Sequence, residues 1–151
     1  LVRINGLMPG VGSPVFSKLD AELAKAMMGV NAVKAVEIGA GANVVNMRGS
    51  GNRDLMVKAG FLSNNSGGIL GGISNGEDID IYVSLKPTSS ISQKTTTVNK
   101  DNEEVDLQVK GRHDPCVGLR AAPILEAMAA LCILDQVLLD KGQCFNVDRD
   151  S

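Results

Sequence analysis

The chain has 151 residues, of which 44% are hydrophobic and 21% charged, and its formal net charge is −2. That length allows one domain with a real core. With one Tyr, three Phe and no Trp, the slightly acidic chain has neither the basic surface nor the stacking platform typical of nucleic-acid binding. No apolar run approaches the roughly 20 residues that span a bilayer, so we expect no membrane segment.

The N-terminal part predicts a short strand followed by a helix. The strand covers residues 1–4, and Ser13 is placed as the N-cap of the helix, with Pro14 at its first position. Apolar residues then recur on one helical face until Gly29, which is typical of a helix stop. The predicted face consists of Phe16, Leu19, Leu23, Ala26 and Met27.

Further strands are predicted at residues 32–38 and 44–48, and alternation of apolar and polar residues predicts two more, at 78–85 and 104–110. The last element is a helix over residues 122–140. It is apolar on most of its circumference, so we expect burial on more than one side. The whole chain is predicted to be an α+β domain with antiparallel strands and at least two helices.

Two predicted loops, 49–73 and 86–102, exceed the roughly 12–15 residues usual for plain connectors. The stretch SNNSGGILGGISNG, residues 63–76, carries five glycines in fourteen positions. Glycine loses more conformational freedom on folding than any other residue, so something must offset this cost. We interpret the stretch as backbone left bare for a ligand, with Ile69 and Leu70 packed in the core. The alternative is a flexible loop; the spacing fits neither a Walker loop nor a dinucleotide fingerprint.

Two other stretches carry residue types that bind anions. KPTSS, residues 86–90, offers a lysine charge and three hydroxyls to a phosphate, although an ordinary strand exit is the alternative. GRHDPC, residues 111–116, offers Arg112 for a bidentate anion contact and Asp114 as a carboxylate at the rim of a site. Here the alternative is an ion-paired surface turn, and His113 is more often structural than catalytic in such a setting.

Metal chemistry is not expected from the cysteines. Cys116, Cys132 and Cys144 lack CxxC spacing, and His113 is the one histidine in the sequence. A closed structural zinc site is therefore not predicted. We expect reduced thiols in a cytosolic protein.

Taken together, the stretches resemble the chorismate synthase family. The resemblance lies in GVGSPVFSKLDAELAKAMM, NAVKAVEIGAG, SNNSGGILGGISNG, LKPTSSIS and KGRHDPCVGLRAAPILEAM. It covers nearly the whole chain and implies that residues 1–151 are the C-terminal portion of one longer domain. The family's two catalytic histidines and most of its substrate-binding arginines belong to segments outside this portion. One departure is Asn65-Ser66, where many members have His-Ala.

The resemblance implies a fold and an activity. The fold is a β-α-β sandwich with internal pseudo-symmetry, of which this chain is about half, assembled as a homotetramer. The activity is that of a cytoplasmic lyase of the shikimate pathway, on the route to aromatic amino acids. It converts 5-enolpyruvylshikimate 3-phosphate to chorismate and phosphate by a 1,4-elimination that needs reduced FMN, and the family is associated with NADP as well. Neither nucleic acid nor membrane is an expected partner.

The resemblance also assigns site residues. Asp114 matches an aspartate near the flavin N5 that is thought to help remove the substrate proton, and residues 86–90 match the segment at the flavin phosphate. The matched flavin-contacting residues are Asn31, Ala32, Gly71, Lys86, Pro87, Thr88, Ser89, Ser90 and Arg112. We expect Gly71, residues 86–90 and residues 112–114 to converge on a single flavin.

Three readings of this chain stay open. It is part of an FMN-dependent lyase, or, when isolated, a catalytically incomplete module that binds FMN or phosphate, or an oligomerisation domain without ligand. FMN and the substrate are both anionic, so a chain of net charge −2 requires cationic side chains from elsewhere. We therefore expect the isolated chain to be inactive. Half a sandwich leaves apolar surface exposed, so we also expect association or poor solubility.

Overall fold

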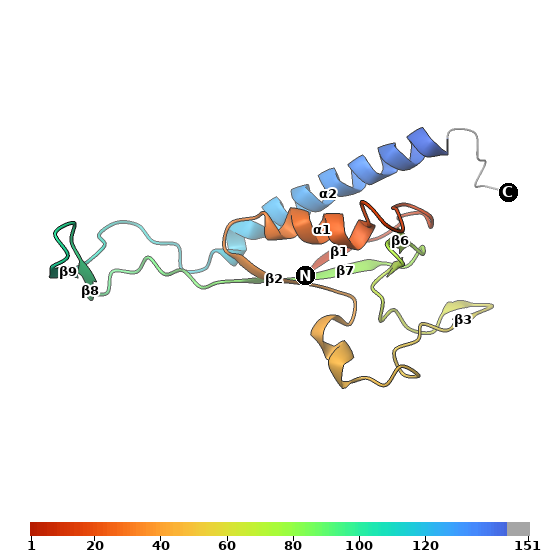
Figure 1. The fold of residues 1–151 in the computed structure, drawn as a ribbon, viewed down its shortest axis with the longest axis horizontal. Coiled ribbons are helices and arrows are strands. Elements are labelled where there is room, and N and C mark those ends of the chain that lie inside the picture. The colour runs from red at the N-terminus through yellow and green to blue at the C-terminus, as the bar shows by residue number, and fades with distance from the viewer. Residues whose placement is uncertain (145–151) are drawn as a thin grey trace.

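The protein is described over residues 1–144 by a computed structural model. Its centre is a three-stranded antiparallel sheet in the order β1-β7-β2 (Figure 1). The strands are β1 (Val2–Ile4), β2 (Val33–Ile38) and β7 (Ile79–Leu85). All three were predicted, with boundaries shifted by one residue or less, because each alternates or concentrates β-branched residues that suit a half-buried strand.

Two helices lie side by side on one face of this sheet (Figure 1). They are α1 (Leu19–Met28) and α2 (Gly118–Gln143). The core between helices and sheet is built from Leu19, Leu23, Met27, Ile79, Ile81, Ala121, Leu125 and Ala129. Full burial of each large side chain contributes about 1.5–3 kcal/mol. The α+β prediction is confirmed, and the body consists of one three-stranded sheet covered by one layer of helices.

The predicted start of α1 is wrong. The helix begins at Leu19 rather than after Ser13, and in the described residues Lys18 at the N-cap position makes no side-chain capping bond. Instead, the Leu19 N–H donates to the carbonyl of Gly72, at 2.9 Å. A tertiary contact thus replaces the local cap, and Phe16, expected on the buried face, is 84% exposed. The predicted stop at Gly29 is confirmed, since its N–H caps the Lys25 carbonyl.

Residues 44–48 do not form the predicted strand. The chain leaves β2 through Gly39 and Gly41, which both have positive φ, and enters the 3-10 helix η1 (Gly41–Asn46). Left-handed glycines turn the chain away from the sheet before another strand can start. The following excursion holds only β3 (Met56–Val57) and β4 (Gly60–Phe61), and the glycine-rich stretch forms β5 (Ile69–Leu70) and β6 (Ile73–Ser74).

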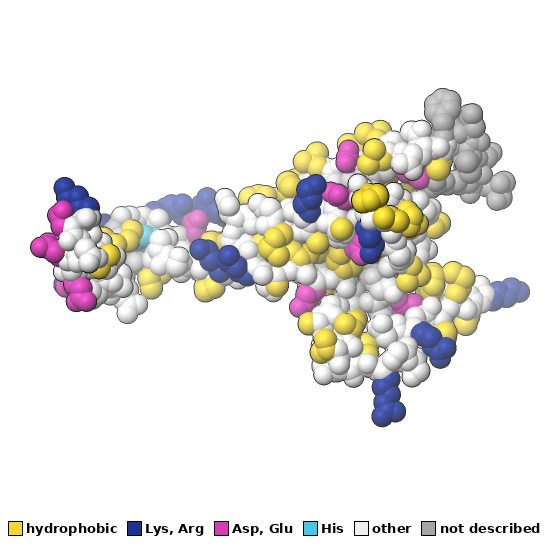
Figure 2. All heavy atoms as spheres, viewed as in Figure 1, with side chains coloured by type: hydrophobic (Ala, Val, Ile, Leu, Met, Phe, Trp, Pro, Cys, Tyr) yellow, Lys and Arg dark blue, Asp and Glu magenta, His cyan; other side chains and the backbone are white. Residues whose placement is uncertain are grey.

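The predicted strand 104–110 is shorter than expected and belongs to an arm. β9 (Glu104–Leu107) pairs with β8 (Thr95–Val98), which was predicted as loop. All eight residues are exposed, and the hairpin projects away from the helices and the sheet (Figure 1). Acidic side chains gather at its tip (Figure 2). The alternation in residues 104–110 therefore reflects pairing within an arm rather than a half-buried strand of the central sheet.

The prediction that the last helix is buried on more than one side is also wrong. The helix α2 has 26 residues and is about 39 Å long at 1.5 Å per residue, so it extends beyond α1, which has ten residues. Only a stripe reaches the core, and hydrophobic side chains stay on the surface along α2 (Figure 2). The exposed ones are Leu119, Ile124, Leu131, Leu134, Leu138 and Leu139.

The length and apolar composition of α2 also meet the criteria for a membrane-crossing helix. The expectation that no run approaches this length is therefore corrected. One such helix is weak evidence for a membrane segment, because core helices pass the same test. Ala121, Leu125 and Ala129 of α2 are indeed part of the core against α1 and the sheet.

Candidate functional site

The first predicted site segment is the turn that follows α1. Ala32 has a φ of +73°, a left-handed conformation that is uncommon for a residue with a side chain. Its carbonyl accepts the N–H of Lys86 at 2.8 Å. Since Val33 pairs with Leu85, the start of β2 and the end of β7 lie together. The Asn31-Ala32 turn and the KPTSS segment are thereby neighbours.

The second segment, around Asp114, meets the same turn. A cavity of about 450 Å³, here called the Asp114 cavity, lies between the turn and the first half of α2. Its polar side chains come from Asn31, Asp114 and Arg120. The apolar part of its wall is formed by Val30, Val117, Ile124 and Met128.

Two guanidinium groups hold the Asp114 carboxylate. Arg112 Nη1 lies 2.6 Å from Oδ1 and Arg120 Nε 3.1 Å from Oδ2. The hydrogen bond from Arg112, with the charges of both arginines, lowers the pKa of Asp114 below its usual range despite partial burial. Arg112 is therefore paired with Asp114 here, and Arg120, in the first turn of α2, is a partner that the sequence reasoning missed.

Buried polar atoms near these segments test whether a phosphorylated cofactor fits. Within residues 1–144, Thr88 Oγ1 and His113 Nε2 are buried and have no hydrogen-bond partner. Leaving such an atom unpaired costs about 1–3 kcal/mol, so a ligand that pairs with it gains that energy. Lys86, Ser89 and Ser90 are exposed beside Thr88 in the chain. The KPTSS segment thus offers a cation, free hydroxyls and an unsatisfied one, which suits a phosphate.

The third segment forms a hairpin whose tip is Gly71. The pair Gly71-Gly72, with φ of +61° and +90°, links β5 to β6 as a two-residue turn in which both residues are left-handed. Among the described atoms, none lies within 4 Å of where a Cβ on Gly71 would stand. Its backbone is open to a ligand. Ile69 is buried as predicted, whereas Leu70 is 47% exposed.

The neighbouring glycines are bare for a different reason. A Cβ on Gly68 would lie 2.8 Å from the Asp78 carbonyl oxygen, and one on Gly72 would lie 2.5 Å from the Ser13 carbonyl oxygen. Gly67 packs in the same way against the backbone of Gly39. These glycines let protein backbone approach protein backbone. The interpretation of the stretch as backbone bared for a ligand is therefore wrong for these three glycines, and for the tip it stays a prediction.

Gly71 does not join the other two segments. Gly72 contacts Leu19 at the start of α1, whereas Asn31 and Ala32 follow the end of that helix. The ten residues of α1 separate the two places by about 15 Å. The residues that line the Asp114 cavity do not include Gly71. The three segments thus do not share one cavity: the Asp114 cavity brings two of them together, and a contact of Gly71 with the same flavin stays a prediction.

Sequence reasoning also missed Asp54, in the loop before β3. Its Oδ1 accepts hydrogen bonds from Ser63 Oγ and the Asn65 N–H, both at 2.7 Å, and its Oδ2 accepts from the Ser66 N–H at 2.8 Å. Burial by itself raises the pKa of this carboxyl, but the hydrogen bonds outweigh burial and lower it to about 2. No sequence signal links Asp54 to residues nine to twelve positions later.

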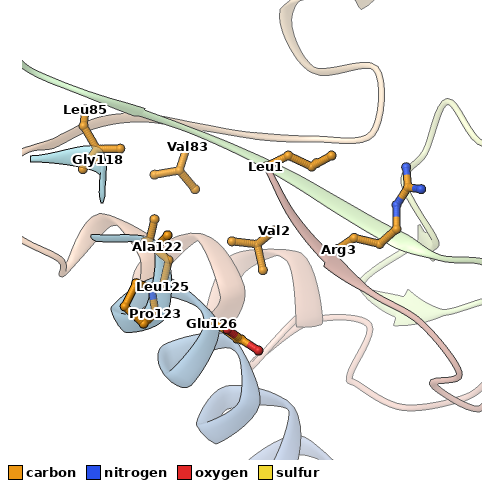
Figure 3. Close-up of a pocket in the computed structure, with 10 residues that line it drawn as sticks. All are labelled: Leu1, Val2, Arg3, Val83, Leu85, Gly118, Ala122, Pro123, Leu125 and Glu126. Carbon is orange, nitrogen blue, oxygen red and sulfur yellow. The ribbon is translucent and has the colours of Figure 1, made fainter. Parts of the chain in front are cut away.

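Another cavity, also about 450 Å³, lies between β1 and the first turns of α2 (Figure 3). Val2, Val83 and Leu125 line it, and the Arg3 guanidinium points away from it, toward Asp80, with which it pairs at 2.6 Å. None of the predicted site residues lines this cavity. In the part of the chain that the structure describes, no group of three or more His, Cys, Asp or Glu is arranged to hold a metal ion.

Comparison with known proteins agrees with the resemblance noted in the sequence. The chorismate synthase family model matches residues 1–138. The crystal structure of a chorismate synthase is similar to this chain, with a TM-score of 0.69 and 29% sequence identity. The match covers 93% of this chain and 36% of the other, so the chain spans about a third of the length of that enzyme. The chain belongs to the chorismate synthase family.

Proposed function

We propose that this chain is part of a lyase that converts 5-enolpyruvylshikimate 3-phosphate to chorismate and phosphate with reduced FMN. The observation that carries the proposal is that Asn31, Ala32 and Asp114 line one cavity in a chain of this family, while the backbone of Lys86 binds Ala32 beside it. These residues come from three separate segments. The sequence points to Lys86 and Asp114 by their chemistry and to Asn31 and Ala32 by the family resemblance.

Two parts of the chain would hold FMN. Asn31, Ala32 and Arg112 would contact it near the Asp114 cavity, and residues 86–90 would take its phosphate. The left-handed Ala32 and the unpaired Thr88 hydroxyl support this assignment, since strain and unsatisfied polar atoms concentrate at ligand sites. Gly71, which does not line the Asp114 cavity, would make a separate contact with FMN. When bound, reduced FMN supplies electron density transiently as the substrate phosphate leaves, with no net redox change.

Asp114 would act as the proton acceptor. A carboxylate held by two guanidiniums is a weak base, because both favour its ionised form. The Arg112 side chain is 72% exposed, so it is free to turn toward an anionic ligand. Once Arg112 pairs with that anion, one hydrogen bond and one neighbouring charge no longer depress the pKa of Asp114. Anion binding and basicity of Asp114 are thereby coupled, and Arg120 keeps the carboxylate in place.

The proposal is tested by the anaerobic rate of chorismate formation from the substrate with reduced FMN. In the full enzyme chain, Asp114→Asn is expected to lower the rate by about 10²–10⁴-fold, the usual share of general base catalysis. Asp106→Asn, on the exposed arm strand β9, is the matched control and should leave the rate unchanged. A wild-type rate in Asp114→Asn, or the absence of saturable FMN binding by the unaltered protein, would contradict the proposal.

On its own, the chain is expected to be a catalytically incomplete module. It spans 36% of the similar enzyme, and its net charge of −2 does not match an anionic cofactor and substrate. We expect residues 1–151 to show no turnover under the same assay. Turnover by this chain alone would refute that expectation. The apolar outer face of α2 favours packing against other parts of the enzyme and does not call for a separate oligomerisation function.

A further inference from the structure

Asp54 holds the segment that leads into the glycine-rich hairpin, residues 63–66. Both carboxylate oxygens are used, since Oδ1 binds Ser63 and Asn65 and Oδ2 binds Ser66. Hydrogen bonds to an ionised acceptor are about twice as strong as neutral ones. Asp54 lies outside the helices and strands, and its side chain is part-buried by these contacts. The loop that carries it therefore bridges to residues 63–66 mainly through this side chain, with one further bond from the Ser63 hydroxyl to the Arg53 carbonyl at 3.3 Å.

Two other side chains also support the hairpin, in addition to backbone bonds such as that from the Leu19 N–H to the Gly72 carbonyl. Asn64 accepts the Gly68 N–H at 2.7 Å and donates to the Asp78 carbonyl at 2.8 Å. On the second strand, β6, the Ser74 hydroxyl donates to the Met8 carbonyl at 2.6 Å and accepts the Val11 N–H at 2.9 Å. Ser74 is only 4% exposed. Both arms of the hairpin are thus fixed to the body, whereas the tip is open.

We propose that Asp54 is a positioning residue, whose carboxylate fixes the peptides of Asn65 and Ser66 and thereby holds the Gly71 tip in the conformation that meets FMN. The inference rests on the proposed function. A stretch with five glycines has many accessible conformations, so fixing it in one of them costs conformational entropy. With Asp54 in place, this cost is met during folding. Without it, the cost falls on ligand binding, and the apparent affinity drops by the fraction of chains with the tip in place.

The test uses Asp54→Asn in the full enzyme chain. Asparagine has the same size but only one acceptor oxygen, and its NH₂ would face a donor N–H. We expect hydrogen exchange at the Asn65 and Ser66 amides to speed up at least tenfold. We expect the Kd for FMN, measured by titration, to rise about tenfold. A rise of this size corresponds to a variant in which about one chain in ten has the tip in the binding conformation. The rate of chorismate formation should recover as FMN is raised, because Asp54 acts on cofactor binding.

Asp80→Asn is the matched control. Asp80→Asn also loses a two-oxygen interaction, with the Arg3 guanidinium at 2.6 and 2.7 Å, but this partner lies on β1 and not in the hairpin. It should leave the FMN Kd and the exchange at Asn65 and Ser66 unchanged. A wild-type Kd in Asp54→Asn, or an equal rise in Asp80→Asn, would overturn the proposal.

Hydrogen exchange separates this inference from the proposed function. If the unaltered protein binds no FMN, the flavin assignment fails, and the contact between FMN and the tip fails with it. If hydrogen exchange at the Asn65 and Ser66 amides is the same in Asp54→Asn and wild type, Asp54 does not fix these peptides, and the positioning role is refuted whatever the protein binds.

Discussion

Glycines at residues 39 and 71 share one backbone conformation but differ in their surroundings. Both are left-handed, with φ of +60° and +61°. A Cβ on Gly39 would stand 2.5 Å from the Gly67 nitrogen, whereas one on Gly71 would meet no described atom within 4 Å. The pair therefore separates the cost of the conformation from the cost of a clash.

Alanine substitution should make this difference measurable. Gly71→Ala is expected to lower the free energy of unfolding by about 1–2 kcal/mol, the cost of a left-handed residue with a side chain. Gly39→Ala should lose a further ~1–3 kcal/mol, because the new methyl group forces the Gly67 backbone to move. Urea denaturation of both variants measures this. Equal losses would mean that the Gly39 and Gly67 backbones are not in contact.

Asp54 gives a pH-dependent contribution to stability. Its pKa of about 2 in the folded state lies below the ordinary value of 3.8. A carboxyl with a lowered folded-state pKa stabilises the protein above its unfolded-state pKa, and this contribution is lost as the pH falls through the folded-state value. The stability difference between wild type and Asp54→Asn should thus be full at pH 6 and shrink between about pH 4 and pH 2. Urea midpoints across this range measure it, and a constant difference would contradict the expectation.

At the scale of elements, α2 has two unlike faces, because only one side of its circumference packs on the core. Leu125 is 5% exposed in the core, whereas Leu134 is 55% exposed on the outer face. Leu125→Ala should lower the free energy of unfolding of residues 1–151 by about 2–5 kcal/mol, through lost burial and the cavity that remains. Leu134→Ala should cost less than about 0.5 kcal/mol, as surface changes do. Urea unfolding decides, and a similar loss in both would show that the outer face is covered.

The β8–β9 arm should be dispensable for the fold. A two-stranded hairpin is marginal by itself, and all its strand residues are exposed. Replacing residues 93–109 with a short Gly-Ser linker should therefore leave the urea midpoint of residues 1–151 nearly unchanged. A loss above about 2 kcal/mol would be outside the range of surface changes and would show that the arm packs on the body.

At the scale of the whole molecule, the chain leaves apolar surface uncovered along α2. Patches of this kind mark interaction sites or association. Residues 1–151 alone are expected to self-associate as concentration rises, and Leu131→Lys with Leu138→Lys should reduce this by placing charges on the outer face. Static light scattering over a concentration series measures it. A clean monomer at high concentration, in the unaltered chain, would contradict this account.

Much of this architecture was predictable from local pattern. Strands β2 and β7, the stop of α1 at Gly29 and a long C-terminal helix follow from periodicity and glycine placement. The cap at Ser13 was wrong, because the carbonyl of Gly72 takes the Leu19 N–H from 53 residues away. The strand at residues 44–48 was wrong, because the left-handed Gly41 begins a 3-10 helix instead.

The candidate site divides in the same way. The sequence by itself determined the α+β class and the residue types suited to a phosphate, since these depend on composition and short-range spacing, and the resemblance of its quoted segments indicated the family and its flavin. Only the tertiary structure decided that Lys86 and Asp114 meet at the Asn31-Ala32 turn while Gly71 lies beyond α1, and that Asp54 clamps the hairpin. These features depend on contacts between residues far apart in the chain, and the periodicity of a segment carries no information about its distant partners.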